Sequence, residues 1–482
     1  MRRRDFLTKA AIATSVAGAL SRANAAQSSP NSEIRVALIG CGSRGPGLAK
    51  ELAAVPGAKL VLACDIDPSH SAKTAAAHGN IPTEKDYRKV LDRKDVDAVL
   101  IATPNHTHVL IAAAACLAGK DVYVEKPVSH SLREGRILAD VIARTGRIVQ
   151  VGLQNVSDKG IDLARDYYKS GALGKITAAH AFWYNVRKPI GKVSKPTPVP
   201  AEIDYDLFCG PRPLVPLARK ELHYDWHWTW DQGSGEFGNT CVHNIDHTRY
   251  LLGITQHATF VQSVGGRLGW EADDGETPNT MLAVLRYPEL DAPFTCEIRD
   301  LPYSPEHADV KSRFRKKSVG TFILGENGLI FFDRGGGYAM DKKGEIVAKF
   351  PGDAGATHMK NFIDAVRSRN PSTLRSPIER GHTSSAACHM ANISYRLGET
   401  GLDLKAVESA APAELLAATE AWASFKEHLV INAIDFAKTP LTLGPKLDFD
   451  GKSEKFVESS ELGRMANMLT ENAYRAPFVL PS

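Results

Sequence analysis

The chain has 482 residues, 43% of them hydrophobic, with 59 Lys and Arg against 55 Asp and Glu. This length is enough for two domains with large cores. Residues 1–25 contain five basic side chains and one acid, so they account for the whole net charge of +4. The rest of the chain is close to neutral, which excludes binding to nucleic acid through a surplus of Lys and Arg.

The first 25 residues have the pattern of a twin-arginine export signal. Arg3-Arg4 precedes Asp5-Phe6-Leu7, a weakly apolar run follows over residues 10–20, and Ala23-Asn24-Ala25 offers a cleavage site. The apolar run is too short to span a bilayer. We therefore predict a signal peptide over residues 1–25 and a mature protein in the periplasm that has no membrane partner. A disordered basic tail is the alternative.

Seven scattered cysteines show no Cys-x-x-Cys spacing. They do not form a recognisable disulfide framework or zinc site, so we expect no metal. Cysteines suited to a reduced compartment are consistent with an exported protein that folds first and travels folded, often with its cofactor bound.

Strands and helices alternate over residues 33–155. Apolar strands are expected at 34–40, 59–65, 97–103, 121–125 and 147–152, with helices at about 45–55 and 108–118. Strands that are apolar throughout and alternate with helices indicate a parallel sheet covered on both faces. We predict an α/β Rossmann domain here.

Glycines at the first strand–helix turn indicate a dinucleotide site. Gly40, Gly42 and Gly45 follow a strand, open a helix and precede the acid Asp65 by the expected interval. Such glycines allow a tight turn beneath a pyrophosphate, and the acid binds the ribose 2′-hydroxyl of NAD. Arg44 leaves the choice between NAD and NADP open, because its side chain could instead reach the 2′-phosphate of NADP.

Five motifs together resemble the Gfo/Idh/MocA oxidoreductases, a family named for glucose–fructose oxidoreductase and inositol dehydrogenase. They are residues 40–45 (GCGSRG), 64–68 (CDIDP), 102–108 (ATPNHTH), 125–127 (EKP) and 233–246 (GSGEFGNTCVHNID). The resemblance covers about residues 34–400, and the remaining tail is similar to that of exported bacterial members. It implies NAD as cofactor, with NADP as the alternative, bound by Gly40, Gly42, Ser43, Arg44, Gly45, Asp65, Thr103, Pro104, Asn105, His108, Glu125, Lys126 and Gln154.

Lys126 and His243 are the predicted catalytic residues. The resemblance places Lys126 beside the nicotinamide, where an ammonium favours a developing alkoxide; a Lys-Pro turn at the surface is the alternative. If residues 239–246 are helical, Asn239, His243 and Asp246 share one face. The resemblance implies an aspartate where this chain has Asn239, and an amide does not raise the basicity of His243 as a carboxylate would. Glu236 is a substitute carboxylate.

Residues 223–231 (HYDWHWTWD) hold three tryptophans. If this segment is extended, Trp226, Trp228 and Trp230 lie on one side, where they could stack on a sugar ring or belong to the core. His223, Tyr224 and His227 could contact hydroxyl groups. We therefore predict substrate binding by Glu236, Asn239, Asp246, Tyr224 and His227.

Residues 156–400 predict an α+β domain with a large open, mostly antiparallel sheet. Strands are expected at 175–184, 258–268, 281–287, 294–300, 318–324 and 329–333, with a hairpin turn at Asn327-Gly328 and a further turn at residues 335–337. An open sheet of this kind predicts a homo-oligomer. Residues 401–482 form an extension, helical over 414–437, that packs on the body.

These features predict an NAD(P)-dependent oxidoreductase that transfers hydride at a hydroxyl-bearing carbon of a sugar or sugar derivative and holds its cofactor tightly. A glycosidase that works by transient oxidation and elimination is the first alternative. A non-catalytic nucleotide-binding sensor is the second, and a metal-dependent hydrolase is weaker because the His and Asp residues lack ligand spacing.

Overall fold

Two sheets organise the chain, and a computed structural model describes them over residues 33–410 and 413–481. The expected signal peptide, residues 1–25, lies outside the described residues. Within the described ranges, no helix has both the length and the apolar character needed to cross a membrane.

The first sheet is parallel throughout and has the strand order β3-β2-β1-β4-β5-β6. Its strands are β1 (Ile34–Ile39), β2 (Ala58–Cys64), β3 (Thr83–Glu84), β4 (Ala98–Ile101), β5 (Asp121–Val124) and β6 (Val149–Val151). Its helices are α2 (Gly45–Ala53), α3 (Pro68–Ala77), α4 (Tyr87–Asp92), α5 (Asn105–Leu117) and α6 (Leu132–Thr145). The order reverses between β1 and β4, the switch point at which such sheets bind ligands. The predicted Rossmann domain is confirmed.

The second sheet has twelve strands, and all its pairs are antiparallel except β7 with β10. Ten strands follow the order β14-β13-β12-β11-β7-β10-β9-β8-β16-β15, and β17 joins β8 to β18. The strands are β7 (Ile176–Tyr184), β8 (Phe260–Gly266), β9 (Thr280–Tyr287), β10 (Leu290–Arg299), β11 (Val319–Gly325), β12 (Gly328–Asp333), β13 (Gly336–Asp341), β14 (Ile346–Pro351), β15 (Glu399–Leu402), β16 (Leu441–Leu443), β17 (Leu447–Asp450) and β18 (Lys455–Phe456). This confirms the large, mostly antiparallel sheet.

Residues 335–337 were expected to form a turn rather than a phosphate loop. Arg334 and Gly335 form the hairpin turn between β12 and β13, and Gly336 and Gly337 begin β13, which pairs with β12 and β14. A Cβ on Gly337 would lie 2.2 Å from the carbonyl oxygen of Phe331, so this close strand pairing needs a glycine. The glycines at residues 335–337 therefore form both a turn and the tightly packed start of a strand.

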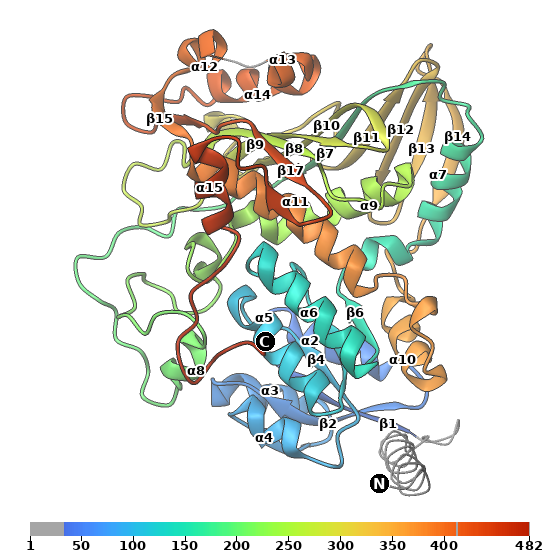
Figure 1. The fold of residues 1–482 in the computed structure, drawn as a ribbon, viewed down its shortest axis with the longest axis vertical. Coiled ribbons are helices and arrows are strands. Elements are labelled where there is room, and N and C mark those ends of the chain that lie inside the picture. Colours follow the sequence, from blue (N-terminus) through green and yellow to red (C-terminus); the bar gives the residue numbers. More distant parts are fainter. Residues whose placement is uncertain (1–32, 411–412, 482) are drawn as a thin grey trace, which may run out of the picture.

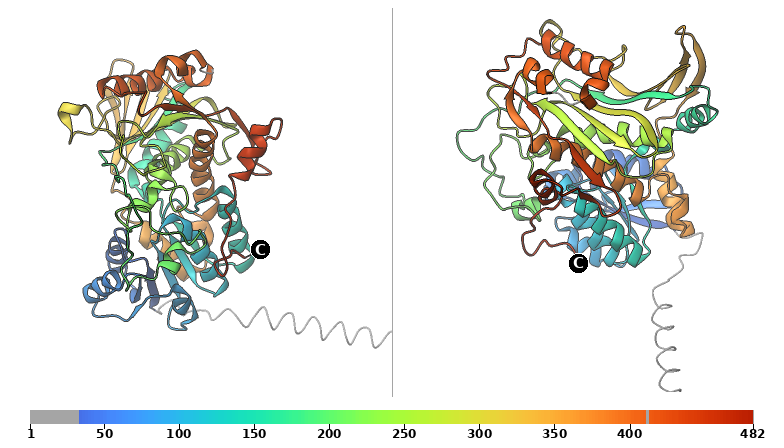
Figure 2. Two further views of the ribbon diagram at one scale, coloured as in Figure 1. Left: turned by 90° about the vertical axis from the view of Figure 1, so that its left-hand side faces the viewer. Right: turned by 45° about the horizontal axis from the view of Figure 1, so that its top comes forward.

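Helices separate the two sheets and also cover the far face of the larger one (Figure 1). The helices after residue 153 are η1 (Gln154–Ser157), α7 (Lys159–Lys169), α8 (Tyr205–Cys209), η2 (Asp225–Trp228), η3 (Phe237–Cys241), α9 (Val242–Leu252), η4 (Pro305–His307), α10 (His358–Ser368), η5 (Pro371–Thr373), α11 (Ile378–Arg396), α12 (Leu404–Ala410), α13 (Ala413–Ala417), α14 (Thr419–Ile431) and α15 (Glu461–Met468). Helices α9 and α11 lie between the sheets, and α12–α14 lie on the outer face of the large sheet (Figure 2).

Side chains alternate between the two faces of β9. Met281, Ala283 and Leu285 point into the core shared with the first domain, whereas Leu282 and Val284 pack in a cluster with α13 and α14. Both faces of this strand are thus buried, which explains its continuous apolar sequence. The C-terminal extension covers this part of the sheet.

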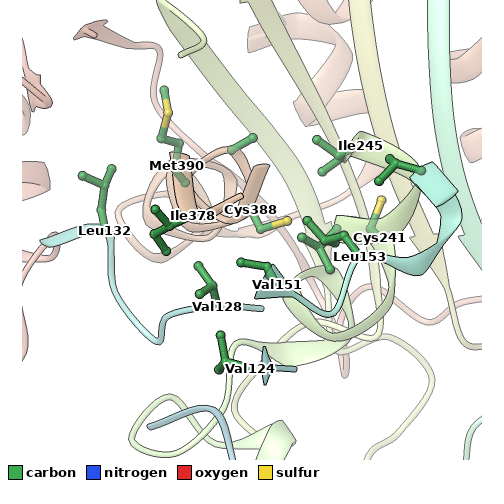
Figure 3. Packing of buried hydrophobic residues seen from close by; sticks show 14 of the residues in the cluster. Val124, Val128, Leu132, Val151, Leu153, Cys241, Ile245, Ile378, Cys388 and Met390 are labelled. Carbon is green, nitrogen blue, oxygen red and sulfur yellow. The ribbon is translucent and has the colours of Figure 1, made fainter. Parts of the chain in front are cut away.

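The hydrophobic core runs without interruption from one domain to the other (Figure 3). Val124 and Val151, at the ends of β5 and β6, belong to the same buried cluster as Cys241 at the end of η3, Ile245 of α9 and Cys388 of α11. Helix α10 also packs its apolar side chains on the first domain, although it follows the large sheet in sequence. The two domains are therefore held together by burial of apolar surface.

Glu454 fastens the C-terminal segment to the body. Its carboxylate accepts hydrogen bonds from Arg136 Nε at 3.0 Å, His257 Nε2 at 3.2 Å and His382 Nε2 at 3.0 Å. Hydrogen bonds to these histidines and Arg136, opposed by burial, hold the pKa of Glu454 far below its ordinary value. These groups come from α6, α11 and the loop before β8, so one carboxylate connects three parts of the fold.

We expect Glu454→Gln to lower the free energy of unfolding by roughly 2–4 kcal/mol, because it removes the charge shared by two buried histidines and the half-buried Arg136. Because the folded pKa is depressed, this contribution is present above the unfolded pKa of about 4.3 and is lost as pH falls further. Chemical denaturation at pH 7 measures it. Glu399→Gln, at an exposed residue, is the control and should change the stability by less than about 0.5 kcal/mol. Equal stabilities of the two variants would contradict the prediction.

Candidate active site

A cavity of about 720 Å³ lies at the carboxyl ends of the parallel strands and extends to the second domain. Strands β2 and β5 are three strand spacings apart, about 14 Å, which leaves room for an extended dinucleotide. The predicted cofactor residues on its wall are Gly40, Gly42, Ser43, Arg44, Asp65, Thr103, Pro104, Asn105, His108, Glu125, Lys126 and Gln154. Gly45 does not line the cavity, because it packs behind the turn as the first residue of α2.

The glycine turn fits a pyrophosphate. A Cβ on Gly40, whose φ is +93°, would lie 2.6 Å from the carbonyl carbon of Ala102, and one on Gly45 would lie 2.1 Å from the Gly40 oxygen. A Cβ on Gly42 would meet only the His70 side chain, whose Nδ1 would lie 3.8 Å away. Helix α2 begins without a side-chain cap, so its backbone N–H groups can bind an anion.

Asp65 and Arg44 have separate partners. Asp65 accepts hydrogen bonds from the backbone N–H of Cys41 at 2.6 Å and of Asp67 at 2.9 Å, which fix its carboxylate at the cavity wall. Arg44 Nε donates to Glu125 Oε1 at 2.8 Å, and its Nη1 donates to Glu51 Oε1 at 2.8 Å. The Arg44 guanidinium is thus held by two carboxylates, which weakens the argument for NADP.

Lys126 reaches across to the second domain. Its Nζ donates to the backbone oxygen of Asn239 at 2.6 Å and to Asn239 Oδ1 at 3.2 Å. His108 braces the turn beneath it, with Nδ1 2.8 Å from the oxygen of Pro127 and Nε2 2.8 Å from that of Thr103. Burial lowers the pKa of Lys126, although Glu125 and Glu236 oppose the shift. An ammonium has three donors, so one remains for a ligand.

Glu125 belongs to the same network. Gln154 Nε2 donates to Glu125 Oε1 at 3.0 Å and to Tyr123 Oη at 2.7 Å. With Arg44 on the same oxygen, Glu125 connects the glycine turn with the end of β5.

His243 lies in the cavity wall at the start of α9, and its Nδ1 has no hydrogen-bond partner among the described residues. Burial lowers its pKa well below 6.5, and the positive charges of Lys126 and Arg334 lower it further. The imidazole is therefore neutral near pH 7. Its ring centroid is 6.4 Å from that of Trp183, which also lines the cavity.

Asn239 acts on Lys126 more directly than on His243. Its carbonyl groups hold the ammonium, and its Nδ2 donates to Glu236 Oε1 at 3.4 Å. Where the family has an aspartate, this chain thus presents neutral oxygens to Lys126. The substitution leaves the charge of Lys126 without a hydrogen-bonded carboxylate.

Glu236 and His227 lie behind the wall, whereas Tyr224 is part of it. His227 Nε2 is 3.2 Å and Arg187 Nη2 is 3.0 Å from Glu236 Oε1. Hydrogen bonding and charge from His227, with Arg187 and Lys126, outweigh burial and lower the pKa of Glu236 to about 2. Arg187 also donates to Tyr224 Oη at 2.9 Å. Glu236 is therefore an ionised support for Arg187.

The structure does not bring Asp246 to the cavity. Its carboxylate accepts from Arg380 Nε at 2.9 Å and Ser384 Oγ at 2.8 Å, both on α11. Asn239 in the π-turn η3 and His243 in α9 both line the cavity, whereas Asp246, three residues further along α9, does not. Asp246 joins α9 to α11 instead.

The tryptophan-rich segment is not extended, so its three tryptophans do not share one face. Tyr224 has φ +66°, and Asp225–Trp228 forms the short helix η2. Trp228 packs on Trp270, and Trp230 lies against Tyr395. Of the three tryptophans, Trp226 alone lines the cavity, and His223 beside it is 3.0 Å from Asp67 Oδ2.

Several wall residues were not predicted. They include His70, Lys73, Tyr87, Trp183, Arg187, Phe208, Thr240, Arg334 and Phe478. Thr240 lies within the motif at residues 233–246, and the others lie outside the motifs. His70, Lys73 and Tyr87 belong to the first domain, whereas packing of the second domain and of the C-terminal segment onto the first brings the rest to the cavity.

Comparison with known proteins identifies the two domains. Residues 34–153 match the family model for the NAD-binding Rossmann fold of the Gfo/Idh/MocA oxidoreductases, and residues 172–266 match that for their C-terminal alpha/beta domain.

Relatives match over part of their length. Levoglucosan dehydrogenase of Pseudarthrobacter phenanthrenivorans is 27% identical over 230 residues, which are 46% of this chain and 51% of that protein. A glycosyl hydrolase family 109 protein of Shewanella amazonensis is 37% identical over 124 residues, 24% of this chain and 27% of that protein. The chain thus spans about half or less of the length of these relatives.

The fold has solved counterparts. The structure of a levoglucosan dehydrogenase in complex with NADH and levoglucosan superposes with a TM-score of 0.54 at 20% identity, covering 74% of this chain and 95% of that one. Residues 34–153 and 172–266 are thus similar to the two domains of the Gfo/Idh/MocA oxidoreductases, and the solved structure shows the same fold.

Proposed function

We propose that this protein is an NAD-dependent oxidoreductase that acts on a sugar or sugar derivative at a hydroxyl-bearing carbon. One observation carries the proposal: Lys126 of the first domain and His243 of the second face the same cavity, and the charge of one lowers the pKa of the other. The levoglucosan dehydrogenase relative supports a carbohydrate substrate.

The two residues have complementary roles. NAD supplies a hydride acceptor when it is bound. His243 is neutral and lines the cavity, so its imidazole can accept a proton from a substrate hydroxyl. Lys126 donates a hydrogen bond to the same oxygen and stabilises the negative charge that develops there. Asn239 orients Lys126 for this task.

We also propose that the cofactor is held tightly. The segment 199–226 packs on Ile66, next to Asp65, and His223 Nε2 contacts Asp67 Oδ2 at 3.0 Å. Phe478 of the C-terminal segment lines the cavity nearby, and Arg475 anchors that segment to the oxygens of Arg212 and Gly210 at 3.1 and 2.9 Å. A dinucleotide would have to displace these elements to leave.

Export and self-association are further proposals. The seven cysteines are free and buried, which suits folding in a reducing compartment before twin-arginine export to the periplasm. A homo-oligomer would use the part of the large sheet that α13 and α14 leave uncovered. Ile346 and Val347 on the edge strand β14 are half-exposed there, at 51% and 52%.

Glycoside cleavage by transient oxidation is the second candidate, favoured by the match to a family 109 glycosyl hydrolase. It needs an extra base for a carbon acid. Of the three candidates, Glu236 and His227 lie behind the wall and only Tyr224 lines the cavity, where burial raises its pKa. A phenol of raised pKa is a poor base, so net oxidoreduction is the better proposal.

We expect the purified protein to reduce bound NAD with a free sugar, and Lys126→Met to lower kcat about 10²–10³-fold without loss of nucleotide. Absorbance at 340 nm with a panel of sugars and polyols measures this reduction, and p-nitrophenyl glycosides are tested in parallel. Release of nitrophenol without net reduction would favour the glycosidase. Inertness of the nucleotide-loaded protein towards both panels would favour the sensor.

We expect Asn239→Asp to shift the acid limb of the kcat/KM profile upward. In the wild type this limb lies well below pH 6.5, because His243 must be neutral and its pKa is depressed. A carboxylate at residue 239 stabilises both protonated His243 and the Lys126 ammonium, so both pKa values rise. An unchanged acid limb in the variant would show that His243 does not control it.

Near-stoichiometric NAD(H) should be released when the purified protein is denatured, as measured by mass spectrometry. His223→Ala removes a hydrogen bond to a carboxylate, worth about 1.5 kcal/mol, and should speed nucleotide loss about tenfold. His307→Ala, on η4 and outside the cavity, is the control. Wild-type protein free of nucleotide would contradict tight retention.

A further inference from the structure

The second-domain part of the cavity presents mostly hydrogen-bond donors and positive charge. Lys126, Arg187 and Arg334 all line it, together with the indole of Trp183. The nearby carboxylates have partners already, Glu236 with Arg187 and Glu125 with Arg44. Two of the cations thus remain without a paired carboxylate.

Arg334 is the more available of these two. It lies in the turn between β12 and β13, where its Nε donates to the backbone oxygen of Ala354 at 3.1 Å. Over the described ranges its guanidinium has no ion pair, although the half-buried Asp333 next to it accepts a hydrogen bond from its backbone N–H. Its Nη groups are left to bind a ligand.

Trp183 provides a second, independent sign of a ligand. Its Nε1 is buried and has no hydrogen-bond partner in the part of the chain that the structure describes, although the side chain lines the cavity. An indole N–H can only donate, so it requires an acceptor. A buried donor without an acceptor is destabilising, and a bound acceptor would remove that cost.

The electrostatic potential in this part of the cavity is positive. The charges of Lys126 and Arg334 both depress the pKa of His243, in addition to burial. A neutral sugar would leave this charge uncompensated, whereas a carboxylate accepts from a guanidinium and an indole N–H alike.

We propose that the substrate is a sugar acid whose carboxylate binds Arg334 and Trp183, beside the hydroxyl that faces Lys126 and His243. This inference rests on the proposed function and narrows its substrate class. Arg334 and Trp183 would be specificity-determining residues.

Matched pairs of ligands test the proposal on the nucleotide-loaded protein by isothermal titration calorimetry. Glucuronate, galacturonate and mannuronate are each compared with the neutral hexose of the same configuration. We expect at least one uronate to bind tenfold or more tightly than its hexose. Arg334→Ala should remove most of that difference. Trp183→Phe, which keeps an aromatic ring but lacks the donor, should weaken uronate binding severalfold.

Arg133→Ala is the control for net charge, since Arg133 is exposed on α6 and outside the cavity. Hexoses that bind as tightly as uronates, or Arg334→Ala that binds uronates as the wild type does, would overturn the proposal. Absence of uronate binding would also overturn it, and so would tighter binding of glucose 6-phosphate than of every uronate. Reduction of bound NAD by a neutral sugar would then leave the proposed function intact, whereas failure of every sugar and sugar acid to reduce it would reject both.

Discussion

The buried cluster between the two sheets is the constraint on which the active site depends (Figure 3). Val124 immediately precedes Glu125 and Lys126, and Cys241 lies two residues before His243. Because both belong to one close-packed core, a shift of either domain would open a cavity in apolar packing and cost several kcal/mol. The relative position of the lysine and the histidine is thus set by side chains that touch neither substrate nor cofactor. Helices α9 and α11, packed between the sheets, carry this coupling.

The pKa shifts of the residues in the cavity also have burial as their cause. Lys126 and His243 are both desolvated, and each positive charge makes another nearby charge more costly, so both pKa values fall. Asn239 keeps this arrangement because its oxygens bind the ammonium without neutralising it. Glu236, which does carry a charge, is turned towards Arg187 and His227 behind the wall. In the resulting cavity His243 is neutral, the pKa of Lys126 is lowered, and the remaining hydrogen-bond donors attract negative charge.

Segments remote in sequence enclose the other end of the cavity. His223 belongs to the second domain and Phe478 to the C-terminal segment, yet both line the wall near the acidic end of β2. The Glu454 cluster and the anchoring of Arg475 hold that segment in place. If the protein is exported as proposed, it cannot rely on free nucleotide outside the cytoplasm, and these segments would retain the cofactor. The proposals of export and of cofactor retention are therefore connected through this one requirement.

The sequence by itself determined the parallel domain, its glycine turn, Asp65 and Lys126, because these features depend on neighbours along the chain and on strand order. It also predicted most strands of the large sheet and the place of His243. Asp246 was placed wrongly, because its carboxylate binds Arg380 and Ser384 of α11. The three tryptophans do not share one extended face, since Tyr224 has a positive φ and residues 225–228 form a short helix. Trp183, Arg187, Arg334 and Phe478 carry no local pattern that predicts a site. Only tertiary packing decided their position, because a side chain from a distant segment becomes part of a cavity when apolar burial elsewhere fixes its backbone.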